Sequence, residues 1–222
     1  MSDPQFSTKN ITRESALSTN KVLRNTYALL SATLVFSALA AVASTFLNIG
    51  YGASLACSFG ALALIWFVLP RTANSSAGVA VVFAFTGLLG FGLGPLLNHY
   101  LSMANGGELI ATAMGGTAAI FLALSGYVLT TQRDFSFLGG FLFAGLMVVL
   151  LGAFAGIFLQ MPGLHLAINA AVILLFSGFI LFDTSRIING GETNYITATT
   201  GIFLSIYNIF TSLLHLLGFA SD

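Results

Sequence analysis

The sequence of 222 residues contains few charged side chains and a single cysteine. Charged residues make up 6% of the chain, against roughly 25% in a typical soluble domain, while 57% of the residues are hydrophobic. The mean hydropathy is +0.95. This composition excludes a soluble globular protein.

The charges also show no excess of either sign. Seven Lys and Arg balance seven Asp and Glu, so there is no basic field to gather phosphates, and nucleic-acid binding is excluded. The lone Cys57 excludes an intrachain disulfide and a multi-cysteine metal site, and we expect it to be a small buried hydrophobe. The sequence contains no H-E-x-x-H, no G-x-S-x-G and no glycine-rich phosphate loop. We therefore expect no catalytic residues, no metal and no cofactor.

Long apolar runs dominate the chain instead. A helix needs about 20 apolar residues to cross a hydrocarbon core of about 30 Å, because lipid offers no partners for an open backbone. Seven runs approach this length, at about residues 26–47, 53–69, 77–97, 109–130, 137–159, 164–182 and 196–218. They predict an all-α membrane protein with one domain of seven transmembrane helices over residues 25–220, after an N-terminal arm, residues 1–24. We expect Pro70 to end the second span and Pro95 to loosen or end the third.

The basic residues test this count, because Lys and Arg resist translocation and stay on the cytoplasmic side. With seven spans, all of them fall on one side of the membrane: Lys9, Arg13, Lys21, Arg24, Arg71, Arg133 and Arg186. The charge distribution therefore predicts a cytoplasmic N-terminus and an extracytoplasmic C-terminus. The long polar arm before the first span argues against a signal peptide.

Glycine is frequent within the predicted spans. Gly90 and Gly94 form one GxxxG motif, and Gly152 and Gly156 form another. Small residues let helix backbones approach closely in lipid. The motifs predict either tight packing within the chain or a homodimer, and the sequence does not decide between the two.

Asp183 is the acidic residue that is hardest to place at a surface. It follows an unbroken apolar run at the end of the sixth span, where a carboxylate is costly unless it faces the bundle or water. In one interpretation, Arg186 lies on the same helix face and the pair marks the end of the span. In the other, Asp183 faces the bundle, where desolvation and the helix C-terminus disfavour its charge, and its protonation gates an ion path. Composition and spacing leave both open.

Three histidines, His99, His165 and His215, map to the end opposite the basic residues. They are predicted to form a pH-sensing cluster or to remain separate interfacial residues. The final span also carries polar side chains, among them Ser205 and Asn208, which indicate contact with other helices rather than with lipid.

Four segments are specific in combination: TQRDFSFLGGFLFAGLMVVLL from Thr131, GFGLGPLL from Gly90, FDTSRII from Phe182 and NIFTSLLHLLG from Asn208. Together they resemble the Bax inhibitor-1 (transmembrane BAX inhibitor motif) family over about residues 17–220. The resemblance implies a seven-helix bundle in which the last helix is central and surrounded by the other six.

The resemblance implies an ion path as one activity. Some members of the family are pH-sensitive calcium leak channels, in which an aspartate on helix six and one on helix seven share a proton. Asp183 matches the first aspartate, but Ser205 stands at the second position, and serine cannot hold that charge. A calcium or proton leak gated by Asp183, with Arg186, Ser205 and Asn208 as further candidates, is therefore the second hypothesis.

The leading hypothesis comes from two further segments, LSTNKVLRNTYALLSATL and GGETNYI, which resemble bacterial members that modulate the membrane-anchored AAA protease FtsH. The resemblance implies a multi-pass protein of the bacterial inner membrane that binds FtsH and restrains its attack on other membrane proteins. The polar arm could be gripped by a cytoplasmic protease, while the packed bundle resists extraction. A third interpretation is a structural bundle in which Asp183 and Arg186 merely position helix six.

Overall fold

The computed structural model describes residues 4–159 and 161–221, with the backbone alone described for residues 4–18. These residues form helices and no strand, which confirms the predicted all-α class. Seven stretches are long and apolar enough to cross a membrane: Thr19–Leu47, Tyr51–Thr72, Ser76–Leu101, Gly106–Thr131, Ser136–Leu159, Pro162–Ile188 and Tyr195–Ser221. Each helical stretch is a little longer than the apolar run predicted for it. The hydrogen bonds of a helix lie within its own backbone, so the helix can continue into polar residues at either end.

The α-helices of the described chain cover the positions of the seven predicted spans. They are α1 (Pro4–Leu47), α2 (Tyr51–Ala63), α3 (Leu69–Thr72), α4 (Ser76–Gly92), α5 (Gly94–Leu101), α6 (Gly106–Thr131), α7 (Gly139–Leu159), α8 (Pro162–Ile188) and α9 (Tyr195–Ser221). A π-helical turn, Leu64–Val68, joins α2 to α3, and a 3-10 turn, Ser136–Leu138, precedes α7.

The two prolines act differently. The third span breaks between Gly92, where α4 ends, and Gly94, where α5 begins, which confirms the interruption predicted at Pro95. The second span does not end at Pro70, as the sequence suggested, but continues to Thr72. A wider π-helical turn directly before Pro70 accommodates the missing N–H donor and the bulk of the ring.

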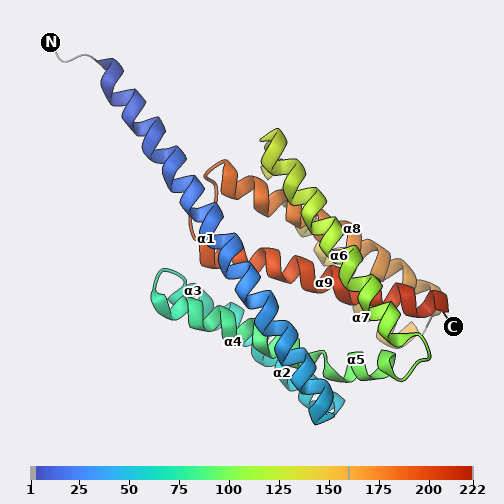
Figure 1. The fold of residues 1–222 in the computed structure, drawn as a ribbon. Coiled ribbons are helices and arrows are strands. Elements are labelled where there is room, and N and C mark those ends of the chain that lie inside the picture. The colour runs from blue at the N-terminus through green and yellow to red at the C-terminus, as the bar shows by residue number, and fades with distance from the viewer. Residues whose placement is uncertain (1–3, 160, 222) are drawn as a thin grey trace.

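The last helix, α9, occupies the centre of the bundle, as the family resemblance implies, but the neighbouring spans do not all reach it (Figure 1). It packs against α1, α4, α6 and α8, while α2 packs on α4 and α7 packs on α8. Phe85 of α4 and Phe203 of α9 meet edge to face in the core, with ring centroids 5.7 Å apart. The helices α2 and α7 thus lie outside the helices that contact α9. Cys57 belongs to α2 and is only partly buried, contrary to expectation.

The first GxxxG motif holds α4 and α5 against α1. A methyl group at Gly90 would overlap the backbone of Ser37, and one at Gly94 would overlap the side chain of Ser44. The approach of the two helices therefore depends on the absence of a side chain at these positions.

The second GxxxG motif holds α7 against α8. A Cβ atom at Gly152 would lie 3.5 Å from Ile168, and one at Gly156 would lie 3.3 Å from the ring of His165. Both motifs thus pack within the chain, as the first of the two interpretations predicted.

Large apolar side chains cover the outside of the bundle. Phe46 is 84% exposed, Phe137 76% and Trp66 72%. Soluble monomers rarely expose extended apolar patches, so a surface of this kind requires the hydrocarbon of a bilayer.

The start of α1 projects beyond the other helices (Figure 1). The helix is continuous from Pro4 to Leu47, so the predicted arm joins the first span without a break. At about 1.5 Å per residue, the part before Thr19 extends roughly 22 Å along the helix axis. This extension leaves the end of the bundle where Arg71, Arg133 and Arg186 lie, which we call the basic end.

Candidate functional site

Asp183 lies in the last turns of α8 and faces the central helix. Its side chain rests against Gly201 of α9, where an added Cβ atom would lie 2.7 Å from Oδ2 of Asp183. The missing side chain at Gly201 therefore creates the space that the carboxylate occupies. Asp183 is partly buried at the interface between α8 and α9 rather than directed at lipid.

Among the described residues, Arg186 forms its ion pair with Glu192 rather than with Asp183. Its Nη2 atom lies 3.6 Å from Oε2 of Glu192 and donates to the carbonyl oxygen of Gly191 at 3.0 Å. The chain reverses direction at Gly190, which has φ +74°, and this turn carries Glu192 back beside α8. The pairing with Asp183 that the spacing suggested is wrong, because the turn supplies a carboxylate with better access to the guanidinium.

The side chains of Ser205 and Asn208 donate hydrogen bonds to backbone carbonyl groups of their own helix, α9. The hydroxyl of Ser205, 1% exposed, donates to the carbonyl oxygen of Gly201 at 3.1 Å, and Nδ2 of Asn208 donates to that of Leu204 at 2.8 Å. Ser205 lies one turn along α9 from the Asp183 contact. Because Ser205 follows Gly201 by four positions, it lies on the same face of α9 as the Asp183 contact, while Asn208 lies further along the helix.

A second polar cluster, which sequence reasoning missed, anchors the end of α8 to the connection before α7. The hydroxyl of Ser185 accepts from the backbone N–H of Phe135 at 2.7 Å and donates to Oδ1 of Asp134 at 3.3 Å. Oδ1 of Asp134 also accepts from the N–H of Ser136 at 2.8 Å. The Asp-x-Ser spacing is typical of such a turn, but its contact with Ser185 depends on the tertiary fold.

Hydrogen bonding also tunes the charge of this cluster. Bonds from the side chain and the backbone of Ser136, with a weaker contribution from Ser185, lower the pKa of Asp134 from its usual value and together outweigh desolvation, which acts in the opposite direction. Asp134 is therefore held as a carboxylate that fixes the connection between α6 and α7.

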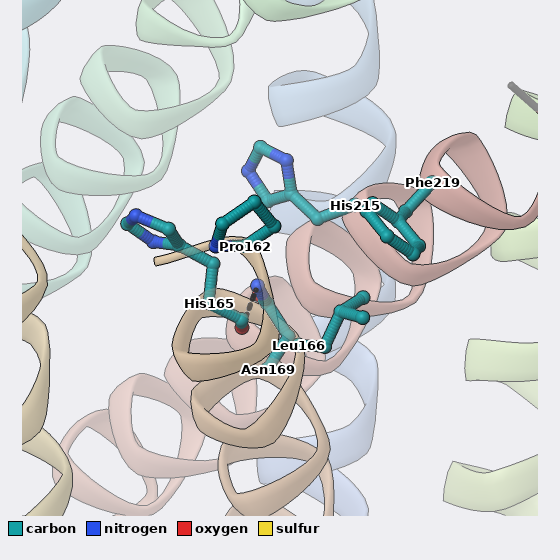
Figure 2. A pocket seen from close by; sticks show the side chains of 6 residues that line it. All are labelled: Pro162, His165, Leu166, Asn169, His215 and Phe219. Atoms are coloured by element: carbon teal, nitrogen blue, oxygen red, sulfur yellow. Dashed lines mark hydrogen bonds between the residues drawn. The ribbon is translucent and has the colours of Figure 1, made fainter. Parts of the chain in front are cut away.

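The histidines gather at the end opposite the basic end. Nδ1 of His215 lies 3.2 Å from the hydroxyl of Tyr100, which joins α9 to α5. His99 stacks edge to face on Tyr100, with centroids 5.3 Å apart. His165 and His215 line one pocket (Figure 2). The clustered arrangement is therefore the one present, while its response to pH stays a prediction.

Within the part of the chain that the structure describes, no three of His, Cys, Asp and Glu gather closely enough to hold a metal ion. The polar groups at the two ends of the bundle are instead joined by hydrogen bonds. The fold and these clusters define a multi-pass membrane protein with a glycine-packed bundle around a central helix.

The chain belongs to the Bax inhibitor-1 family. The family model described as "Inhibitor of apoptosis-promoting Bax1" matches residues 19–222. The chain is 58% identical over 209 residues to "Modulator of FtsH protease YccA" of Escherichia coli (strain K12), with 94% of each protein covered. It is 50% identical over 222 residues to an "Uncharacterized membrane protein" of Vibrio cholerae, with 100% of this chain and 99% of the relative covered.

Proposed function

We propose that this protein binds the FtsH protease in the bacterial inner membrane and restrains its action on other membrane proteins. The observation that carries the proposal is the 58% identity, over nearly the whole length of both proteins, to a modulator of that protease. The charge distribution supports an orientation in which the basic end faces the cytoplasm.

Two structural features fit this role. The start of α1 projects from the basic end, within reach of a protease whose ATP-driven part is cytoplasmic (Figure 1). In the membrane domain, the close packing of α4 and α5 against α1 at Gly90 and Gly94 opposes unfolding and extraction of the bundle. A chain that is easily engaged and slowly extracted occupies the protease and so slows the degradation of competing substrates.

The test is a reconstituted degradation assay. FtsH, a membrane substrate and the full-length protein are placed together in proteoliposomes, with an equal amount of an unrelated seven-helix membrane protein as the control. We expect slower substrate degradation and recovery of the protein with affinity-purified FtsH. An unchanged rate without co-purification would contradict the proposal.

Removal of residues 1–18 tests the role of the projecting segment. We expect FtsH to degrade the shortened protein itself more slowly than the intact one, because the protease has lost its point of engagement. Circular dichroism and thermal unfolding check that the bundle is intact. Equal half-lives of the two proteins would show that FtsH does not engage the protein through residues 1–18.

An ion leak is the second candidate, and the contact of Asp183 with the central helix favours it. The hydroxyl of Ser205 is bonded within α9, so it does not take the place of a second carboxylate. Under the leading proposal we expect no calcium flux into liposomes for the native protein between pH 5 and 8, with a flux gained only on Ser205→Asp, whereas the ion-leak candidate predicts a pH-dependent flux of the native protein. A native flux that Asp183→Asn abolishes would make this a channel with a single carboxylate gate.

A further inference from the structure

An open pocket of about 670 Å³ lies between α8 and α9 at the end opposite the basic end. Six residues line it: Pro162, His165, Leu166, Asn169, His215 and Phe219. In Figure 2 the two imidazole rings lie on one side, while Leu166 and Phe219 lie on the other. The pocket therefore offers a polar wall and an apolar wall to the same ligand.

The polar wall is suited to an anion. Both histidine side chains are exposed, and none of the six lining residues is acidic. When the hydroxyl of Tyr100 donates to Nδ1 of His215, the ring hydrogen is on Nε2, which is then free to donate to a ligand. Protonation of His165 and His215 adds positive charge to the same wall.

The start of α8 adds to this field. Pro162 is both a lining residue and the first residue of a 27-residue helix. The N-terminus of a helix carries partial positive charge. Pro162 has no N–H, and the N–H groups of Leu164 and His165 donate to the carbonyl oxygen of Met161, so α8 contributes its dipole rather than free donors. The dipole of α8 thus reinforces the effect of the two histidines.

The surrounding elements supply few groups that compete for a proton or an anion. From α5 come His99 and Tyr100, and the hydroxyl of Tyr100 contacts Nδ1 of His215. On α6, Glu108 is exposed in the first turn. The sequence of α7 holds no titratable residue, and Asp222 follows α9 outside the described residues.

The apolar wall and the position of the pocket indicate the source of the anion. Leu166 and Phe219 lie within the terminal turns of two spans, where a bilayer meets water. A ligand that reaches them carries hydrocarbon beside its charged group. A phospholipid of the adjacent leaflet has both, with an anionic phosphate directly above its acyl chains.

We propose that this pocket binds the phosphate of an anionic phospholipid headgroup, and that the affinity rises as His165 and His215 become protonated. Binding of this kind does not involve FtsH. It would make the junction of α8 and α9 responsive both to acidity and to the lipid composition of the extracytoplasmic leaflet.

The test measures binding of soluble short-chain lipids to the full-length protein in detergent. Dihexanoyl phosphatidylglycerol, dihexanoyl phosphatidylcholine and inorganic phosphate are titrated at pH 5.5 and pH 7.5, and the dissociation constant is measured by isothermal titration calorimetry, which needs no histidine signal and so applies to every variant. We expect phosphatidylglycerol to bind about tenfold more tightly at pH 5.5, as charge-assisted hydrogen bonds form. It should also bind more tightly than the other two probes.

The side chains to be replaced are exposed, and thermal unfolding verifies that each variant keeps the fold. The double variant His165→Gln/His215→Gln should lose the tightening at pH 5.5. His99→Gln, which removes a nearby histidine outside the pocket, should keep it. Phe219→Ser should weaken binding of phosphatidylglycerol while leaving that of inorganic phosphate unchanged.

Three results would overturn the proposal. The first is equal affinity for phosphatidylglycerol at both pH values, or in the double variant and the native protein. The second is equal affinity for phosphatidylcholine, which would remove the requirement for an anionic headgroup. The third is equal affinity for inorganic phosphate, which would assign the pocket to free phosphate rather than to lipid.

Discussion

At the residue scale, the Asp183 carboxylate and Gly201 form a matched contact. The carboxylate occupies the space that a side chain at Gly201 would fill. A group placed in this way is sensitive to the volume of its neighbour, because membrane bundles are held by close packing rather than by the hydrophobic effect between helices.

Gly201→Ala should therefore destabilise the bundle by about 1–3 kcal/mol, since the new methyl group would lie 2.7 Å from Oδ2 of Asp183. The measurement is thermal unfolding in detergent. Gly126→Ala is the control, because nothing lies within 4 Å of the added atom. Adding Asp183→Ala to Gly201→Ala should recover part of the loss, and a fully additive double variant would refute the contact.

Asp134 provides a pH-dependent prediction at the same scale. Its pKa is lower in the folded protein than its usual value of 3.8, so its stabilising contribution is present above about pH 4 and is lost as the pH falls through the folded pKa. At pH 7, Asp134→Asn should unfold at a lower temperature than the native protein. That difference should shrink steadily towards pH 3, whereas a constant difference would show that the carboxylate charge is not involved.

At the scale of single elements, helix contacts are set by glycines and interruptions by prolines. Pro95 divides a span into α4 and α5, whereas Pro70 is absorbed by a π-helical turn. The residues before each proline explain the difference in part. Gly92 ends α4 and Gly94 begins α5, on either side of Leu93, whereas a continuous helical turn precedes Pro70.

Gly90→Ala should destabilise the protein by about 1–3 kcal/mol, because its methyl group would meet the backbone of Ser37 and no rotamer change can relieve that overlap. Gly115→Ala on α6 is the matched control. It meets nothing within 4 Å and should be neutral or slightly stabilising, since alanine favours a helix over glycine. Equal unfolding temperatures for the two variants would show that α1 and α4 are less closely packed than the structure indicates.

At the scale of the whole molecule, an odd number of spans separates the two termini. Four of the basic residues lie in the first half of α1. The other three lie in connections or at helix ends on the same side of the bundle as the start of α1. The histidine pocket is at the opposite end. The molecule thus carries its basic residues at one end and the histidine pocket at the other.

Fusions at the C-terminus test this orientation. Alkaline phosphatase, which is active only outside the cytoplasm, should be active when fused after Asp222, and green fluorescent protein exported through the same route should be dark. The same two reporters fused after Arg133 should show the reverse pattern. An active phosphatase at Arg133 would invert the predicted topology.

The sequence by itself determined the seven spans and the collection of all basic residues at one end. Hydropathy and charge act residue by residue, because each span must satisfy its backbone alone in lipid. The pattern of apolar runs therefore sufficed for the fold class, and the family motifs predicted the central position of α9.

Only the tertiary structure decided which groups meet. Arg186 pairs with Glu192 rather than with Asp183, because a turn at Gly190 brings the second carboxylate back. His165 and His215 share a pocket although they are 50 positions apart in the chain numbering. Such contacts depend on how separate helices are rotated and packed, and that rotation is set by close contacts between side chains rather than by hydropathy.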